Sequence, residues 1–344
     1  MEFVRKLPDA DELKKELALD KKQEQDRQNI IGELQAILSG TSHKKIVIVG
    51  PCSADREDAV LEYMDRLAGL RKQVKDRLCI IPRIYTSKPR TNGNGYKGLV
   101  HRPDSSAGTD DIYDGIMATR RMHYHVIKET GMFGADEMLY PEAHYYITDL
   151  LAYSAVGARS VENQQHRLVS SGLDMPVGMK NPTGGDNEVM LNAIFAAQSR
   201  QRFIYHGYEC ESKGNPYAHA ILRGYTDSMG KSHSNYHFEN VSDLYDLYQK
   251  KNLKNASVII DCNHGNSRKH YDEQVRIGKE VFGLCREYDF ANRFIKGLMI
   301  ESYLEDGAQM IGQNIYGKSI TDPCLGWSKT ERLIKELADI TALS

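Results

Sequence analysis

The sequence predicts an α/β fold in which eight parallel strands close into a (β/α)8 TIM barrel, preceded by a helical arm. From residue 45 onward, short runs of β-branched residues alternate with longer helical patterns. Many of the short runs are apolar at nearly every position, as in parallel strands that are buried on both faces. A chain of 344 residues also has the length that eight strand–helix units and an added segment require.

Nine segments have the character of strands, and a barrel of this kind has eight places for them. The segments are 45–50, 80–85, 133–139, 155–159, 177–180, 202–207, 219–224, 258–262 and 297–302. Helical patterns lie between them at 57–75, 115–130, 145–153, 188–200, 242–251 and 274–288. Segment 202–207 leads into a Gly-, Asn- and Pro-bearing stretch, so we expect it to form an added strand or hairpin before the sixth barrel strand.

An open doubly wound sheet is the alternative architecture. Such a sheet usually carries a glycine-rich G-x-G-x-x-G turn after its first strand. The first strand here leads into Gly50-Pro-Cys-Ser53 instead, which favours the barrel.

Residues 1–44 precede the first strand, and we expect them to form a helical arm on a catalytic barrel of residues 45–344. Two helical patterns, 12–19 and 23–38, are followed by Ser39-Gly40-Thr41, which ends the second of them. Such an arm is suited to cover the barrel bottom, to mediate subunit contact or to carry regulation.

The overall composition is typical of a soluble, cytoplasmic protein. The formal net charge is −2, from 45 basic and 47 acidic residues, and no long block of one sign indicates binding to nucleic acid or to a membrane. The N-terminal residues show no signal-peptide pattern, and the longest weakly polar run, 150–158, is too short to span a bilayer. Six dispersed cysteines without a C-x-x-C pair are expected to be reduced thiols.

Charged and polar residues stand at the ends of the expected strands, where active sites of such barrels lie. In chain order they are Cys52, Arg83, Lys88, Arg90, Glu137, Arg159, Lys180, Arg223, His264, Glu301 and Asp322. A single arginine at such a position is usually a surface ion-pair partner, and a single cysteine is usually a small buried apolar residue. The shared placement of all these groups predicts one site that binds anions.

Which cysteine belongs to that site is left open by spacing alone. Cys52 follows the first strand, whereas Cys262 would share a face with His264 if the seventh strand continued in extended form.

A thiolate, an imidazole and two carboxylates can bind one divalent ion such as Mn, Fe, Co or Zn, and they do not select among these metals. Arginines suit bidentate binding of phosphate and carboxylate. Such a site suits carbon–carbon bond formation between phosphorylated metabolites.

Several motifs resemble those of the type I 3-deoxy-D-arabino-heptulosonate 7-phosphate (DAHP) synthase family, in the family's order and over most of the chain. They are Ile48-Val-Gly-Pro-Cys-Ser53, Arg83-Ile-Tyr-Thr-Ser-Lys-Pro-Arg-Thr91, Gly95-Tyr-Lys-Gly-Leu99, Gly157-Ala-Arg-Ser160, Pro176-Val-Gly-Met-Lys-Asn181, Ile221-Leu-Arg-Gly224, Ile260-Asp-Cys-Asn-His264, Met299-Ile-Glu-Ser302 and Tyr316-Gly-Lys-Ser-Ile-Thr-Asp322. The resemblance implies condensation of phosphoenolpyruvate with erythrose 4-phosphate at the start of the shikimate pathway, by a homodimer or homotetramer.

The resemblance also implies a role for each matching residue. The metal ligands are Cys52, His264, Glu301 and Asp322, so the resemblance favours Cys52 over Cys262. The catalytic residues are Lys88, Glu137 and His264, and the phosphoenolpyruvate-binding residues are Arg83, Ala158, Arg159, Lys180 and Arg223. Lys88 is expected between the two substrates, and Arg90 with Thr91 at the aldose phosphate.

Some segments depart from the family pattern. The segment after the third strand reads Tyr140-Pro-Glu-Ala-His-Tyr-Tyr146, and the one after the fifth reads Asn181-Pro-Thr-Gly-Gly185. Residues 173–175 and 203–205 lack the small hydroxyl residues expected of a phenylalanine or tyrosine inhibitor site, which argues against such feedback control. A related synthase that uses another aldose is the alternative function. A catalytically silent binding subunit is disfavoured because every ligand position is intact.

Overall fold

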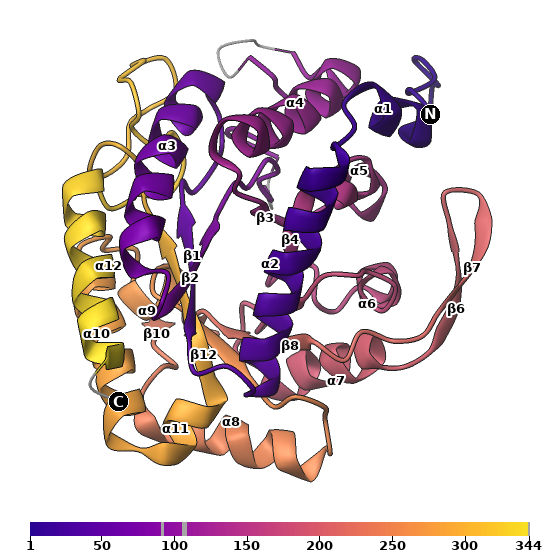
Figure 1. Cartoon of the computed structure of the whole chain (residues 1–344). Coiled ribbons are helices and arrows are strands. Elements are labelled where there is room, and N and C mark those ends of the chain that lie inside the picture. The colour runs from indigo at the N-terminus through magenta and orange to yellow at the C-terminus, as the bar shows by residue number, and fades with distance from the viewer. Residues whose placement is uncertain (91–92, 105–108, 343–344) are drawn as a thin grey trace.

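The computed structural model of the chain describes residues 1–90, 93–104 and 109–342. Eight parallel strands form one sheet in the order β2-β1-β12-β11-β8-β5-β4-β3. They are β1 (Lys45–Gly50), β2 (Leu78–Pro82), β3 (Gly134–Glu137), β4 (Leu151–Val156), β5 (Val177–Lys180), β8 (Ala218–Leu222), β11 (Val258–Asp261) and β12 (Ile295–Glu301). The two edge strands meet through a parallel bridge between Arg83 and Ala135, so the sheet closes into the predicted barrel (Figure 1).

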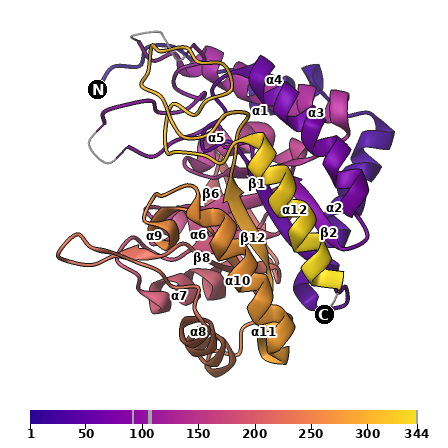
Figure 2. The same ribbon diagram turned by 90° about the vertical axis from the view of Figure 1, so that its left-hand side faces the viewer.

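Helices surround the barrel, as the views in Figures 1 and 2 show. The longer ones are α3 (Glu57–Val74), α4 (Ile112–Thr130), α6 (Gln164–Ser170), α7 (Asn187–Gln198), α8 (Phe238–Lys250), α10 (Glu273–Glu287) and α12 (Trp327–Ala342). Shorter turns are α5 (Pro141–His144), the 3-10 helix η1 (Tyr145–Leu150), α9 (His264–Ser267) and α11 (Asp289–Phe294).

The strands are apolar on both faces because each face contacts a different part of the core. In β1, Ile46 and Ile48 belong to the cluster that fills the barrel, while Val47 and Val49 pack with the surrounding helices. All six residues of β1 are buried. This two-sided burial explains why the strand reads as a continuous apolar run rather than an alternating one.

The expected excursion before the sixth barrel strand is confirmed. Strands β6 (Gln201–Tyr205) and β7 (Tyr208–Ser212) pair antiparallel as a two-stranded sheet of their own, and Figure 1 shows them projecting from the barrel. A second small hairpin, β9 (Tyr225–Thr226) with β10 (Ser232–His233), follows β8 and was not expected from the sequence.

The prediction of a helix over 145–153 is wrong at its C-terminal end. The 3-10 helix η1 stops at Leu150, and the fourth barrel strand begins at Leu151. That strand reads Leu-Ala-Tyr-Ser-Ala-Val and is buried at all six positions. It has only one β-branched residue, so local preference favoured a helix and tertiary burial decided for a strand. The strand expected at 155–159 therefore begins earlier, and Arg159 lies in the turn after it.

The N-terminal arm contains α1 (Ala10–Glu16) and α2 (Lys21–Ser39), and α2 covers the bottom of the barrel (Figure 1). A capping box between Asp20 and Gln23 begins α2, and Gly40 ends it with a φ of 81°. Apolar residues of α2, including Leu34, join the cluster that fills the barrel. Arg27 is buried and donates to the carbonyl of Leu151 at 2.7 Å, at the start of β4.

Within the described residues, the sequence offers no helix with the length and apolar character of a membrane span.

Two buried histidines should make the stability of the fold depend on pH. Burial lowers the pKa of His144 and of His219 to about 4, from an ordinary value of 6.5. Between these pH values the unfolded chain takes up protons that the folded chain does not, so the free energy of unfolding falls as the pH drops from 6.5 to 4. Each histidine contributes a slope of about 1.4 kcal/mol per pH unit within this range.

Urea unfolding at a series of pH values measures this slope. His219→Gln should reduce it by the share of one histidine, whereas His270→Gln, at an exposed position, should leave it unchanged. An equal slope in the wild type and in His219→Gln would contradict the assignment.

Candidate active site

A cavity of about 270 Å³ lies at the carboxyl ends of the barrel strands. Its described lining is strongly cationic: Arg83, Lys88, Arg90, Arg159, Lys180, Arg223 and Lys269 stand against the carboxylates of Glu137 and Asp322. Ala158 and His264 also line it. The excess of positive charge suits ligands that carry phosphate and carboxylate groups.

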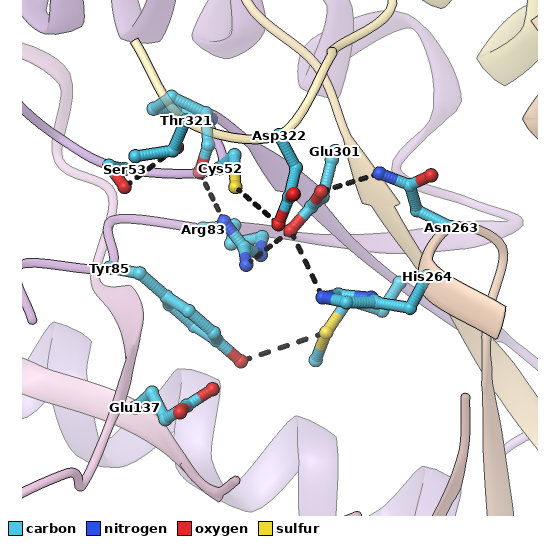
Figure 3. A network of polar contacts seen from close by, with 12 residues as sticks. Cys52, Ser53, Arg83, Tyr85, Glu137, Asn263, His264, Glu301, Thr321 and Asp322 are labelled. Atoms are coloured by element: carbon cyan, nitrogen blue, oxygen red, sulfur yellow. Dashed lines mark hydrogen bonds and ion pairs between the residues drawn. The ribbon is translucent and has the colours of Figure 1, made fainter. Parts of the chain in front are cut away.

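Beside this cavity, Cys52, Glu301 and Asp322 form a group that could hold a metal ion (Figure 3). Each offers one ligand atom, and these atoms lie within 4.8 Å of one another. Cys52 follows β1, and Glu301 ends the neighbouring strand β12, where its backbone pairs in register with Gly50. Asp322 lies on the loop between β12 and α12. His264 adjoins this group, with its Nε2 3.7 Å from Oε1 of Glu301.

The donor set of this group fits a cation. The Lys88 ammonium lies 2.6 Å from Cys52 Sγ and 3.1 Å from Asp322 Oδ2, so the thiol and the carboxylate already attract positive charge. Burial and the nearby Glu301 carboxylate raise the pKa of the Cys52 thiol to about 11. A thiol in this environment needs a close cation to become a thiolate ligand.

Neighbouring side chains hold Glu301 in place, as Figure 3 shows. Arg83 donates to Oε1 at 2.8 Å, and Asn263 donates to Oε2 at 2.5 Å. Gln274 donates to the Glu301 carbonyl at 3.0 Å and accepts from its amide at 2.8 Å. Burial alone would raise the pKa of the Glu301 carboxyl, but His264 and Arg83 outweigh burial and keep that pKa below its usual value.

Asp261 orients His264, and sequence reasoning gave it no role. It is the last residue of β11 and is fully buried, and its Oδ2 lies 2.9 Å from His264 Nδ1. This contact directs Nε2 of the imidazole toward Glu301, as second-shell carboxylates do for histidine ligands. Burial would raise the pKa of Asp261, but His264 and Lys180 outweigh burial and lower it. The sequence does contain a feature that points to Asp261, because a charged residue at the end of an apolar, buried strand is unusual.

The shared face expected for Cys262 and His264 is wrong. Strand β11 ends at Asp261, and His264 has a φ of 54°, so the chain is no longer extended between the two residues. Cys262 is buried in the core cluster that the surrounding helices contribute to. Of the two competing cysteines, Cys52 is the one that lies with Glu301 and Asp322.

Lys180 lines the cavity and lies close to two carboxylates. Its Nζ lies 3.5 Å from Glu137 and 3.6 Å from Asp261. Glu137 ends β3, and its carboxylate lies against the backbone of Gly157, where an added Cβ would come within 2.4 Å of Oε1. Glycine at 157 therefore makes room for this carboxylate.

The remaining anion-binding candidates differ in exposure. Arg83 is fully buried and stacks over the ring of Tyr85 at 3.7 Å, Arg223 is half-buried, and Arg159 is exposed. Arg90 donates from Nε to the carbonyl of Tyr96 at 2.8 Å. The expected aldose-phosphate residue Thr91 lies outside the described residues.

A buried network fixes the loop that carries Lys88 and Arg90, and it too was not expected. Asp136, next to Glu137 on β3, accepts from the amide of Thr86 at 3.0 Å and from the Thr86 hydroxyl. The same carboxylate lies 3.2 Å from Nε2 of His123. Asp136 therefore ties the loop after β2 to β3, at the closing seam of the barrel.

Comparison with known proteins agrees with the fold and the motifs. A model of the family described as "DAHP synthetase I family" matches residues 19–335. A solved structure titled phospho-2-dehydro-3-deoxyheptonate aldolase, from Francisella tularensis SCHU S4, is similar at 30% identity with a TM-score of 0.92. The similarity covers 100% of this chain and 99% of that one.

Curated relatives carry the same enzyme name. The Trp-sensitive phospho-2-dehydro-3-deoxyheptonate aldolase of Escherichia coli O157:H7 is 37% identical over 313 residues, covering 89% of this chain and 86% of the relative. The Trp-sensitive enzyme of Buchnera aphidicola subsp. Schizaphis graminum is 38% identical, covering 91% and 87%. The Tyr-sensitive enzyme of Salmonella typhimurium is 36% identical, covering 89% and 85%. Together with the barrel and its motifs, these matches show that the chain belongs to the DAHP synthetase I family.

Proposed function

We propose that this chain condenses phosphoenolpyruvate with D-erythrose 4-phosphate and water to give DAHP and phosphate, the first step of the shikimate pathway. The observation that carries the proposal is the cation-lined cavity beside the group formed by Cys52, Glu301 and Asp322. Membership of the DAHP synthetase I family supports it.

One divalent metal ion is proposed to bind Cys52, His264, Glu301 and Asp322. When bound, such an ion acts as a Lewis acid that polarises the aldehyde carbonyl of the aldose. Mixed sulfur, nitrogen and oxygen ligands are compatible with Mn, Fe, Co or Zn. Asp261 and Asn263 serve to orient His264 and Glu301 toward the shared position.

Phosphoenolpyruvate is proposed to bind Arg83, Lys180 and Arg223, with Arg159 and the backbone near Ala158 closing one side. These groups line one cavity and come from four different strand ends. The aldose phosphate is assigned to Arg90, with Thr91 as its proposed partner. Lys88 stands between Cys52 and this cavity, so its ammonium can reach the aldehyde oxygen. Alignment of two anionic substrates by fixed cations supplies a large part of the expected rate acceleration.

The proposed chemistry uses Lys88 and Glu137, which both line the cavity. C3 of phosphoenolpyruvate forms a bond to the aldehyde carbon, and the developing alkoxide takes a proton from Lys88. Water adds to C2, which has become oxocarbenium-like, and gives its proton to Glu137. The C2 hydroxyl then becomes the carbonyl of DAHP as the bond between C2 and the phosphate oxygen breaks, and inorganic phosphate leaves with the hydroxyl proton.

A panel of aldoses tests the choice of substrate. Phosphate release from phosphoenolpyruvate is measured with four-, five- and six-carbon aldoses, each with and without a phosphate group. D-erythrose 4-phosphate should give the highest kcat/KM. A higher value for another aldose would support the alternative synthase, and no turnover with any aldose would support the silent binding subunit.

Lys180→Met should lower kcat/KM for phosphoenolpyruvate by about 10- to 100-fold, the worth of one charge-assisted hydrogen bond. The main change is expected in the KM for phosphoenolpyruvate, with a smaller change in the KM for the aldose. Steady-state kinetics with each substrate varied in turn measures both constants. Lys335→Met, at an exposed position on α12, is the control that should leave both unchanged. An unchanged KM for phosphoenolpyruvate in Lys180→Met would contradict the assignment.

A homodimer or homotetramer and a cytoplasmic location are proposed from family resemblance. The projecting β6–β7 hairpin supports an oligomer, because Ile204 and Tyr208 on it are 76% and 72% exposed. Exposed apolar side chains on a protruding element are typical of subunit contacts.

Absence of feedback control by phenylalanine or tyrosine stays a prediction. A cavity of about 410 Å³ lies between the arm and this hairpin, lined by Arg27, Leu173, Phe203 and Tyr205 among others. Adding each aromatic amino acid to the aldose assay tests the prediction directly.

A further inference from the structure

A second cationic cavity lies at the opposite end of the barrel from the candidate active site. This bottom cavity has a volume of about 370 Å³ and is lined by the end of α2, the start of β1, the end of α11 and the start of β12. Its charged lining consists of Lys44, Lys45, Arg293 and Lys296, and no carboxylate is found among the described residues that line it. Figure 1 shows the lower ends of α2, β1 and β12 meeting in this region.

Lys296 is the unusual member of this lining. Its side chain is only 7% exposed, and within the described part of the chain no hydrogen-bond acceptor or carboxylate pairs with its ammonium group. Lys45 beside it is 5% exposed, but its ammonium donates to the carbonyls of Asn292 and Ile295 at 2.6 and 2.7 Å. Burial and the charge of Lys45 lower the pKa of Lys296 to about 8. The ammonium of this largely buried residue faces the cavity without an opposite charge, so this position attracts an anion.

The other groups around the bottom cavity divide into paired and available cations. Lys44 already pairs with Glu33 at 2.7 Å. Arg293 is exposed, and no ion pair with it occurs among the described residues. The C-terminal turn of α2 places partial negative charge nearby. However, its Ala36 carbonyl is taken by the amides of Thr41 and Ser42 at 2.9 and 3.0 Å.

We propose that the bottom cavity binds a small tetrahedral dianion, either inorganic phosphate or the phosphoryl group of a small metabolite. Lys296 is its main partner inside the cavity, and Arg293 binds it from the open side. The site shares no lining residue with the cavity assigned to phosphoenolpyruvate.

Anomalous diffraction from crystals soaked in selenate locates the site, because selenate is a tetrahedral dianion that can be identified by its scattering. One peak is expected within hydrogen-bond distance of Lys296 Nζ, in addition to any peak in the active-site cavity. Peaks in the active-site cavity alone would overturn the proposal.

Thermal unfolding with and without inorganic phosphate tests the same site in solution. Without phosphate, Lys296→Met should melt at or above the wild-type temperature, because it removes an unpaired charge from a largely buried residue. Added phosphate should raise the melting temperature of both proteins, but Lys296→Met should need about tenfold more phosphate than the wild type for the same increase. Lys296→Arg retains the cation and should respond as the wild type does, and Lys44→Met removes a lysine that is already paired and should also respond normally.

Equal phosphate responses of Lys296→Met and the wild type would overturn the proposal, as would a lower melting temperature of Lys296→Met in phosphate-free buffer. Replacing inorganic phosphate with glycerol 3-phosphate decides between the two sources of the ligand. Tighter binding of the ester, lost in Lys296→Met, would assign the site to a phosphorylated metabolite. Tighter binding of inorganic phosphate would assign it to the free ion.

Discussion

Cys52→Ala is expected to lower kcat by about a thousandfold or more in metal-replete buffer, since Lewis-acid stabilisation is worth several kcal/mol. The Cys52 thiol is fully buried and lies 3.7 Å from Asp322 Oδ2. Its removal takes away the single sulfur ligand from the proposed set. The dissociation constant of the metal should therefore also rise, as measured by competition with a chromophoric chelator.

Cys262→Ala is the matched control for this experiment. Cys262 is also fully buried and was the competing candidate from spacing, but it does not belong to the group of close ligand atoms that Cys52 forms with Glu301 and Asp322. Its replacement should reduce stability modestly and leave metal affinity unchanged. Full activity of Cys52→Ala, or equal losses of metal affinity in the two variants, would show that Cys52 is not the ligand.

Arg83→Leu should lower the free energy of unfolding of the metal-free protein by about 3 kcal/mol or more, the usual result of breaking a buried ion pair. Both partners of the Arg83–Glu301 pair have side chains that are 1% exposed. Loss of the guanidinium leaves the Glu301 carboxylate buried beside Asp322 with fewer positive neighbours. Arg83 also donates to the carbonyl of Pro51, so the turn that carries Cys52 loses a support.

Urea unfolding in the presence of a chelator measures this loss. Repeating the measurement with a saturating divalent metal separates the effect of the Arg83 guanidinium from that of a bound metal cation. Bound metal should reduce the difference between the variant and the wild type, because a cation again faces Glu301. Arg202→Leu is the control, since Arg202 is exposed and pairs with Glu211 on the protruding hairpin. An ion pair of that kind contributes less than about 1 kcal/mol. Equal losses in the two variants would contradict a structural role for the buried pair.

The sequence predicted the bounds of the barrel strands well where prolines stand next to the strands. The bounds expected for β1 and β5 agree with the structure, and prolines follow β1 at Pro51 and precede β5 at Pro176. The bounds of β4 were missed because Leu151–Val156 contains small residues that suit a helix equally well. Only burial on all sides, which depends on the closed barrel, makes that segment a strand.

The candidate site was predicted as a set of strand-end residues, and its internal pairing was not. Strand ends could be read from local patterns, so Glu301 and Lys180 were placed correctly. The pairing of Asp261 with His264 and of Asp136 with Thr86 depends on how the chain turns after each strand. Spacing also could not decide between Cys52 and Cys262, because the left-handed backbone at His264 has no marker such as glycine.

Anomalous diffraction at the manganese edge, from crystals soaked in Mn²⁺ after chelation, tests the proposed metal site most directly. One strong peak is expected, bonded to Cys52 Sγ, His264 Nε2 and one carboxylate oxygen each of Glu301 and Asp322. Its occupancy should fall in Cys52→Ala crystals and persist in Cys262→Ala crystals. A peak bound elsewhere, or no peak among these four side chains at saturating Mn²⁺, would contradict a metal-dependent condensation at this end of the barrel.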